Sequence, residues 1–271
     1  LAEHIASGAD CSVAGIRVPR HEASAFGIID AGADGHIKAF LEKPEDPPGL
    51  PDSPEESFAS MGNYIFTCQP FVECLTKDAA DDISKHDMGG NVVPYFVERG
   101  TAYVYDFTKN DVPGSTEKDR DYWRDVGTID AYHLAHMDLV SVEPEFNLYN
   151  KKWPIFTNQV QMPGAKFTLR GNSEDSIVSS GCIISGGDVD RSVLSPAVMI
   201  DKWAKVEESV LFEQTKVGRN AVIRRAILDK HVIVDDGAEV GVNRDADLAR
   251  GFYVSDGGVT VVPKGLRVHA Q

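Results

Sequence analysis

The sequence predicts an α/β domain with a mixed sheet, followed by a triangular parallel β-helix of hexapeptide repeats. Strand-like and helix-like segments alternate up to about residue 140, which is typical of α/β domains. From about residue 165 the helical pattern gives way to aliphatic residues at a short, regular spacing, which is typical of stacked coils. We therefore expect domains at residues 1–140 and 166–271, joined by a connector at 141–165.

The first residues resemble the end of a helix, LAEHIASGAD, so we expect that the beginning of the protein has been removed. A strand is expected at Cys11–Val18, and a hairpin from Phe26–Asp30 and His36–Lys43, turned by AGADG. Five prolines between residues 44 and 54 predict a long loop, because proline removes a backbone donor. The remaining expected elements are a strand at Ser60–Phe66, helices at Pro70–Lys77 and Asn91–Arg99, a strand at Ala102–Phe107 and a helix at Thr128–Val140.

The repeat in the second half follows a spacing of 6 + 6 + 5 residues, so that each triplet of aliphatic residues lies 17 residues after the one before. This spacing predicts three short faces per coil, each sending one aliphatic side chain inward. The twelve expected inward residues are Ile177, Ile183, Val189, Leu194, Ile200, Val206, Leu211, Val217, Ile223, Leu228, Val234 and Val240. Asp245–Arg250 interrupts the period, and Phe252–Val262 is expected to cap the stack as a last coil. Between the halves, the aromatic stretch around Trp153 is expected to form a packed connector.

The composition of the chain excludes several classes of function. Its 27 Lys and Arg residues against 42 Asp and Glu residues give a net charge of −15, which repels nucleic acid and anionic membranes. No apolar run approaches the roughly 18 residues that a membrane helix needs. The four cysteines form no C-x-x-C pair, so neither a zinc ribbon nor a disulfide framework is indicated, and we expect a cytoplasmic protein.

Two positions in the first half carry candidate chemistry. Glu42 and Lys43 end a strand and precede the proline-rich loop, at a sheet edge where α/β folds commonly bind ligands. A carboxylate accepts hydrogen bonds from sugar hydroxyls and an ammonium binds phosphate, but a solvated ion pair explains the same spacing. Asp125 precedes Gly-Thr and a helix start. This residue is either a ligand of Mg²⁺ beside a phosphate or part of the cap of the following helix.

Several linked motifs carry a resemblance to a known family. In order they are FLEKP at 40–44, ASMGNYIF at 59–66, HDMGGNVVP at 86–94 and YWRDVGT at 122–128, followed by the hexapeptide repeat. The chain resembles the ADP-glucose pyrophosphorylases, also called glucose-1-phosphate adenylyltransferases, over its whole length. The resemblance implies the C-terminal part of a Rossmann-like nucleotidyltransferase domain with a mixed sheet, then a left-handed parallel β-helix. It also implies that glucose 1-phosphate attacks the α-phosphorus of Mg·ATP, releasing pyrophosphate and giving ADP-glucose for glycogen synthesis.

The resemblance assigns substrate-binding roles to residues of these motifs. Lys43 would bind the sugar phosphate and Glu42 the glucose hydroxyls, while Gly27, Ser60 and Tyr64 would line the same pocket. The alternatives are a strand glycine at Gly27, a local hydrogen-bonding role for Ser60 and a core aromatic at Tyr64.

The resemblance also assigns the metal site. Asp125 would be one of two aspartate ligands of Mg²⁺, and Trp123 and Asp87 would shape its surroundings. Asp125 and Lys43 are thus the expected catalytic residues. Trp123 as a core aromatic is the alternative.

The departures from the family pattern carry expectations of their own. The glycine-rich loop that cradles the triphosphate, and the other metal-binding aspartate, belong to a segment of the family that is not in this sequence. Since backbone N–H groups of such a loop bind anions, we expect the chain to be inactive by itself. Met88 replaces an aromatic residue of the family, and we expect it to be tolerated as a packing residue.

The family further implies a homotetramer and control by sugar-phosphate or nucleotide effectors. Outward cations of the repeat are candidates for an effector site: Arg224, Arg225, Lys230 and Lys264. Solubilising surface charges are an equally good interpretation. Three other functions stay open: a sugar-1-phosphate nucleotidyltransferase for another nucleotide, a CoA-dependent acyltransferase with His231 as base, and a noncatalytic regulatory subunit that binds sugar phosphate.

Overall fold

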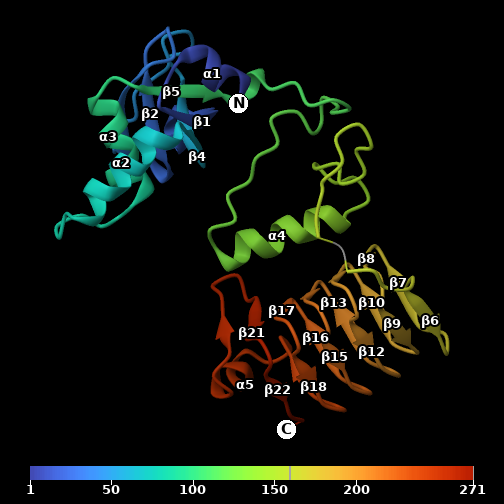
Figure 1. Cartoon of the computed structure of the whole chain (residues 1–271). Helices are drawn as coiled ribbons and strands as arrows, with labels where there is room; N and C mark the ends of the chain where they lie inside the picture. The colour runs from blue at the N-terminus through green and yellow to red at the C-terminus, as the bar shows by residue number, and fades with distance from the viewer. Residues whose placement is uncertain (159, 271) are drawn as a thin grey trace. The chain divides into compact units, whose positions relative to one another are not determined.

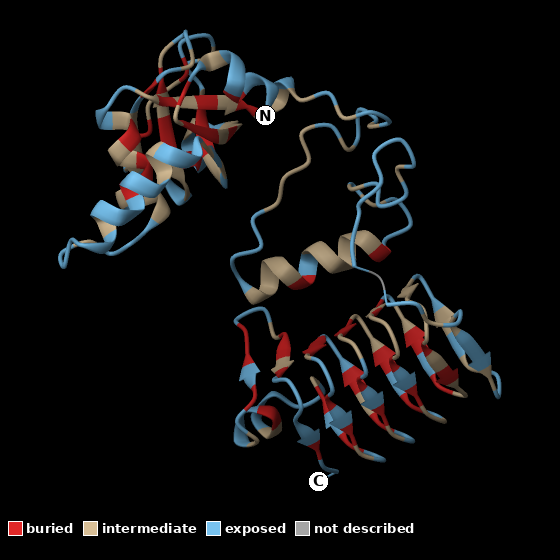
Figure 2. Cartoon of the chain, viewed as in Figure 1, coloured by how far each residue is buried: buried red, intermediate tan, exposed pale blue. Residues whose placement is uncertain are grey.

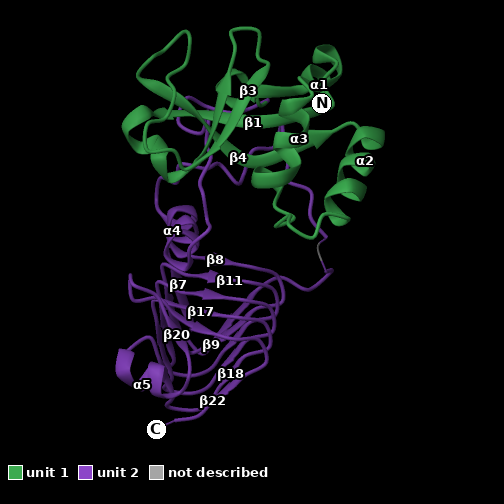
Figure 3. Ribbon diagram, turned by 90° about the vertical axis from the view of Figure 1, so that its left-hand side faces the viewer, with its two compact units in different colours: residues 1–112 green, residues 113–271 purple. Residues whose placement is uncertain are grey.

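The structure is a computed structural model of the chain, and it describes residues 1–158 and 160–270. Position 159 of the predicted connector and position 271 at the end of the predicted β-helix domain lie outside the described residues. The chain divides into two compact units, residues 1–112 and 113–271 (Figure 3), and each is described by itself. The predicted domain boundaries at residues 140 and 165 stay predictions.

Unit 1 is built on a five-stranded mixed sheet with the strand order β3-β2-β4-β1-β5 (Figure 1). Strand β5 runs parallel to β1, and the other neighbours are antiparallel, which confirms the predicted mixed sheet and the β2–β3 hairpin. The strands are β1 (Cys11–Pro19), β2 (Gly27–Ala31), β3 (Ile37–Glu42), β4 (Glu56–Phe66) and β5 (Ala102–Asp106). Residues 43–55 form neither helix nor strand, as their prolines predict.

Helices and turns join these strands. They are α1 (Ala2–Ser7), the 3₁₀ turns η1 (Arg20–Ala25) and η3 (Phe107–Lys109), α2 (Cys68–Ala79), the π-helical turn η2 (Met88–Val92) and α3 (Val93–Glu98). The main core of unit 1 contains the buried side chains of Val13, Ile29 and Phe96. Buried segments of the sheet and of the helices beside it are red in Figure 2. The predicted helix at 91–99 is thus only partly correct, because its first turn is π-helical and begins at Met88.

Unit 2 contains a parallel β-helix with three sheets, one for each face of the coil (Figure 1). Apart from β20, which pairs antiparallel with β21, successive coils stack in parallel register. The first face has β7 (Asn172–Glu174), β10 (Asp188–Asp190), β13 (Lys205–Glu207), β16 (Val222–Arg224) and β19 (Glu239–Val240). The second has β8 (Ile177–Val178), β11 (Val193–Leu194), β14 (Val210–Leu211), β17 (Ala226–Leu228), β21 (Thr260–Val262) and β20 (Tyr253–Val254). The third has β6 (Lys166–Thr168), β9 (Ile183–Ser185), β12 (Met199–Ile200), β15 (Lys216–Val217), β18 (Ile233–Val234) and β22 (Arg267–Val268).

The inward row confirms the predicted repeat from Val189 onward, where every predicted aliphatic side chain is buried in one continuous core. In the first coil the prediction is wrong by one residue. Leu194 pairs with Val178 and Ile200 pairs with Ile184, so Ile177 and Ile183 occupy the neighbouring positions. The inward residues Ile184 and Val189 are five positions apart, whereas Ile200 and Val206 are six apart, and the shorter corner contains Gly186 and Gly187. A Cβ at Gly187 would lie 2.7 Å from Cγ2 of Ile200, which no larger residue accommodates.

Helix α4 (Ile129–Val140) packs on this β-helix within unit 2. Thr128 caps its start by accepting a hydrogen bond from the Ala131 N–H at 3.1 Å, as predicted. Its buried His133 contacts the Glu208 carbonyl at 2.6 Å. Helix α5 (Arg244–Ala249) interrupts the coils where the sequence predicts, and β22 extends the stack by one further strand.

The connector is not packed as we expected. Trp153 is 58% exposed and Phe156 is 91% exposed. Residues 152–158 and 160–165 form neither helix nor strand. None of the helices in residues 1–158 and 160–270 is long and apolar enough to cross a bilayer.

Candidate functional site

Glu42 and Lys43 lie where β3 ends and the proline-rich loop begins. The Lys43 N–H donates to the Phe26 carbonyl at 3.1 Å, and its φ of 46° places it in the left-handed region, which costs a residue other than glycine about 1–3 kcal/mol. Lys43 Nζ lies 4.0 Å from Oε1 of Glu42, and the two side chains are 64% and 66% exposed. Such a surface pair contributes roughly 0–1 kcal/mol, so both charged groups remain available to a ligand.

Gly27 lies directly beside Glu42, because the two are partners in the β2–β3 ladder. A Cβ at Gly27 would lie 3.2 Å from Cζ of Phe40 and 3.3 Å from Oε2 of Glu42. Phe40 also contacts the opposite segment, since a Cβ at Gly89 would lie 3.2 Å from its Cε1. The two glycines therefore let the Phe40 ring fit between the β2–β3 hairpin and the turn η2.

Ser60 and Tyr64 flank an irregularity in β4. Gly15 pairs with Ser60 and Val13 pairs with Tyr64, so the single residue between them on β1 faces three residues on β4. The extra residues form a bulge around Gly62, whose φ of 70° requires glycine. Bulges of this kind redirect side chains and are common beside active sites.

Tyr64 is the residue that connects the members of this group. Burial raises the pKa of its phenol, the negative charges of Asp87 and Glu42 raise it further, and a hydrogen bond with Ser60 opposes the change. The phenol is therefore protonated at neutral pH and can donate to a ligand oxygen. Glu42, Ser60 and Asp87 therefore each act on the Tyr64 phenol, from three separate segments of unit 1.

Asp87 caps the turn η2. Its Oδ1 accepts a hydrogen bond from the Gly90 N–H at 2.6 Å, which fixes the glycine pair after Met88. Met88 is half-buried and packs against the main core together with Phe40, in agreement with the predicted packing role. Our sequence reasoning missed Phe40 and Gly89 as members of this site. Their signals are the FLEKP motif and the glycine pair that follows HDM.

Asp125 and Trp123 belong to unit 2 and are described with it. The segment that carries them is held to residues 145 and 146: the Tyr122 ring lies 5.0 Å from that of Phe146, and Arg124 forms an ion pair of 2.9 Å with Glu145. Trp123 is half-buried. Asp125 is exposed, and its Oδ1 accepts a hydrogen bond from the Gly127 N–H at 2.9 Å. Thr128 supplies the side chain that caps α4, and Asp125 holds the turn directly before it.

The donor set at Asp125 suits Mg²⁺, which prefers carboxylate oxygens and is usually held by one or two carboxylates together with substrate phosphates. Among residues 1–158 and 160–270, no three His, Cys, Asp or Glu side chains gather as a metal site. Of the described residues, Asp125 is the one carboxylate that we assign to the ion, and substrate phosphates and water would supply further ligands.

Three of the four cations proposed for effector binding are already paired. Arg224 Nε lies 2.8 Å from Oε2 of Glu207, Arg225 Nη1 lies 3.5 Å from Oε2 of Glu208, and Lys230 Nζ lies 3.5 Å from Oε2 of Glu213. In the described part of the chain, Lys264 is exposed and forms no ion pair. His231 lies exposed at a corner of the coil. An effector anion would have to compete with carboxylates for the first three residues.

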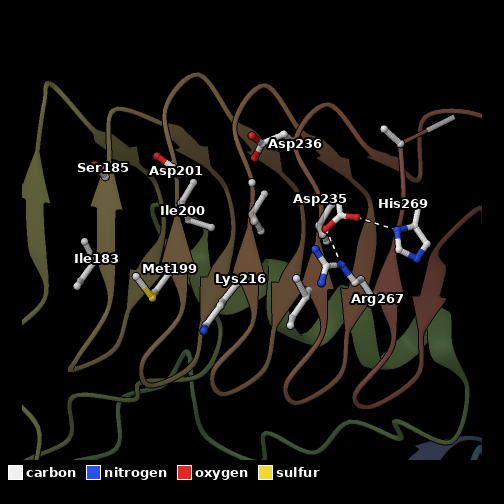
Figure 4. Close-up of a pocket in the computed structure, with 15 residues that line it drawn as sticks. Ile183, Ser185, Met199, Ile200, Asp201, Lys216, Asp235, Asp236, Arg267 and His269 are labelled. Carbon is white, nitrogen blue, oxygen red and sulfur yellow. Dashed lines mark hydrogen bonds and ion pairs between the residues drawn. The ribbon is translucent and has the colours of Figure 1, made fainter.

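A cavity of about 910 Å³ lies along the third face of the β-helix (Figure 4). Ile183, Met199 and Lys216 line it from successive coils. Arg267 and His269 both point toward Asp235, each at 2.8 Å (Figure 4). Burial opposes the change, but these two hydrogen bonds hold the pKa of Asp235 below its ordinary value. None of the residues predicted for substrate or metal lines this cavity.

Comparison with known proteins gives two family matches. The nucleotidyl transferase family matches residues 1–142, and the family described as "GlmU-like, C-terminal hexapeptide" matches residues 163–262. Curated relatives named glucose-1-phosphate adenylyltransferase are similar over 99% of this chain. The relative from Cutibacterium acnes is 64% identical over 66% of its own length, that from Frankia casuarinae 56% over 66%, and that from Parafrankia sp. 56% over 67%. The chain thus spans about two thirds of the length of these relatives.

Proposed function

Because this chain belongs to the nucleotidyl transferase family, we propose that the protein is a glucose-1-phosphate adenylyltransferase. It transfers AMP from ATP to glucose 1-phosphate and releases ADP-glucose and pyrophosphate for glycogen synthesis. The observation that carries this proposal is the exposed Glu42–Lys43 pair at the end of β3, with Gly27 as the ladder partner of Glu42. The relatives, whose name states this activity, support the assignment.

In the proposed complex, Lys43 neutralises charge on the sugar phosphate. Glu42 accepts hydrogen bonds from glucose hydroxyls, and the protonated phenol of Tyr64 donates to a substrate oxygen. Gly27 keeps the space beside Glu42 open, because any side chain there would press on the carboxylate. These contacts fix the sugar phosphate in one orientation, which is the main requirement of phosphoryl-type transfer.

The reaction needs no protein nucleophile. A phosphate oxygen of glucose 1-phosphate forms a bond to the α-phosphorus of ATP, and the bond from that phosphorus to the bridging oxygen of pyrophosphate breaks. Lys43 binds the phosphate that attacks. Asp125 would contribute a carboxylate oxygen to Mg²⁺, and the hydrogen bond from the Gly127 N–H fixes the turn that carries Asp125. Mg²⁺, when bound, supplies charge neutralisation at the phosphate oxygens.

Assembly and regulation are further parts of the proposal. We assign to the protein a homotetrameric state and sugar-phosphate or nucleotide effectors. Lys264 is the best cation for an effector phosphate, because the other three candidates have carboxylate partners at 2.8–3.5 Å.

The test is pyrophosphate release by the natural full-length protein with glucose 1-phosphate and Mg²⁺. ATP, GTP, UTP and dTTP are offered in parallel. We expect release with ATP. Release with another nucleotide alone would identify a different sugar-1-phosphate nucleotidyltransferase. No release with any of the four, together with retained binding of glucose 1-phosphate, would favour a noncatalytic regulatory subunit.

A further inference from the structure

Lys43 adopts a backbone conformation that its neighbours must hold in place. Its φ of 46° is unusual for a residue other than glycine, and it precedes Pro44, where the extended conformation is preferred. A conformation of this kind persists only where the surrounding structure fixes it. The hydrogen bond from the Lys43 N–H to the Phe26 carbonyl fixes the backbone on the N-terminal side of Lys43. The backbone on its C-terminal side, from Pro44 onward, needs a second contact that fixes it.

Arg20 supplies that contact. Its Nε donates to the Pro47 carbonyl at 2.6 Å, and its Nη2 donates to Oδ1 of Asp46 at 2.7 Å. Its own backbone N–H donates to the Glu55 carbonyl at 2.8 Å. A guanidinium that donates from two nitrogens fixes orientation as well as distance. One residue therefore holds both ends of the proline-rich loop, residues 44–55.

Arg20 also begins η1, the turn that leads to Gly27. The segments before Gly27 and after Lys43 are thus tied together outside the pocket, at a residue that touches neither the sugar nor the phosphate in our assignment. Pro47 and Leu50 of the loop are buried, and the buried Ser57 hydroxyl donates to the Pro48 carbonyl at 2.6 Å. The loop is accordingly a fixed support for Lys43.

We propose that Arg20 is a positioning residue for sugar-phosphate binding, acting through the proline-rich loop on the backbone of Lys43. The inference rests on the proposed function, because it assigns Arg20 to the affinity for glucose 1-phosphate. Loss of the Arg20 contacts releases Asp46 and Pro47, so Lys43 relaxes from its left-handed conformation and its ammonium leaves the phosphate position.

The same loop offers a matched control. Asp52 lies near its far end and forms an ion pair of 2.9 Å with Arg17, while Asp46 forms one of 2.7 Å with Arg20. Both aspartates are exposed. Arg17 keeps its contact with Asp106 when Asp52 is replaced. Asp46→Ala and Asp52→Ala therefore remove similar surface pairs, of which only the first is next to Lys43.

The experiment measures KM for glucose 1-phosphate and for ATP in the natural full-length protein and its variants. Arg20→Ala is expected to raise KM for glucose 1-phosphate about tenfold, the effect of one hydrogen bond to a charged group, with KM for ATP unchanged. Asp46→Ala should change the same KM in the same direction, and Asp52→Ala should leave it unaltered. Arg20→Lys, which keeps the charge near Asp46, should restore part of the affinity.

A double variant separates positioning from a general loss of stability. If Arg20 acts through Lys43, then Arg20→Ala adds nothing to the KM for glucose 1-phosphate once Lys43→Ala is present. Additive effects would overturn the inference, and so would an unchanged KM in both Arg20→Ala and Asp46→Ala. If Arg20→Ala does not fold, Asp46→Ala decides the result alone. Absence of turnover in the unaltered protein would be a failure of the proposed function, which removes this inference with it.

Discussion

Gly27 and Glu42 are partners in the β2–β3 ladder, and a Cβ on the glycine would lie 3.3 Å from Oε2 of the carboxylate. The same Cβ would meet the Phe40 ring at 3.2 Å. The space on this face of the hairpin is therefore set by the absence of a side chain at Gly27. Glu42 keeps its position only while that space stays open.

We expect Gly27→Ala to raise KM for glucose 1-phosphate by roughly three- to tenfold, because small displacements of a binding group reduce affinity and rate. The free energy of unfolding should change little, since the contact is tight but does not involve backbone atoms. Steady-state kinetics check the prediction. Gly164→Ala is the control, because a Cβ at Gly164 meets no atom within 4 Å; an equal effect in both variants would contradict our account.

The register of the first coil predicts that alanine substitutions at two adjacent isoleucines change the free energy of unfolding by different amounts. Ile184 is fully buried in the β-helix core, whereas Ile183 belongs to the row of residues outside it. Ile184→Ala should lower the free energy of unfolding by about 2–5 kcal/mol, and Ile183→Ala by less than about 1 kcal/mol. Urea denaturation of the two variants side by side measures this difference. A larger loss of stability in Ile183→Ala than in Ile184→Ala would contradict this register and would support Ile183 as the inward residue.

The buried imidazole of His133 predicts a dependence of stability on pH. Burial lowers its pKa below the ordinary value of 6.5, Arg225 and His136 act in the same direction, and the Glu208 carbonyl and carboxylate oppose them. The unfolded chain therefore takes up a proton below about pH 6.5 that the folded chain does not. The free energy of unfolding should fall as pH decreases through this range, by up to about 1.4 kcal/mol per pH unit.

Denaturation curves between pH 5 and 8 test this expectation through the variant His133→Gln, which removes the titrating group. The slope that His133 contributes should vanish in that variant. His231→Asn is the control, because His231 is exposed and asparagine accepts its left-handed φ of 62°. An unchanged slope in His133→Gln would show that other groups cause the dependence.

Much of the β-helix follows from spacing alone, because inward positions repeat from Val189 to Val240 and each coil stacks on the last. In the first coil the predicted inward residues were wrong by one position, for a local reason. Ile177 is followed by Val178 and Ile183 by Ile184, so both members of each pair fit an aliphatic slot, and only the short Gly186–Gly187 corner decides between them.

The candidate site was less accessible to sequence reasoning. Spacing alone left Glu42 and Lys43 as an ordinary ion pair, and the family resemblance raised them to site residues. Contacts between distant segments were out of reach: neither the position of the Phe40 ring between two glycines nor the bond from Arg20 to Pro47 leaves a periodic signal. The contacts that a long side chain makes across a loop are set by the folded backbone, so the sequence pattern does not indicate them.

The central claim is that the end of β3 binds the phosphate of glucose 1-phosphate through Lys43. The most direct measurement is KM for glucose 1-phosphate in Lys43→Ala of the natural full-length protein, beside Lys38→Ala, an exposed lysine of the same strand. We predict a rise of at least about tenfold for Lys43→Ala, with KM for ATP unchanged and Lys38→Ala equal to the unaltered protein. An unchanged KM for glucose 1-phosphate in a folded, active Lys43→Ala variant would contradict the account.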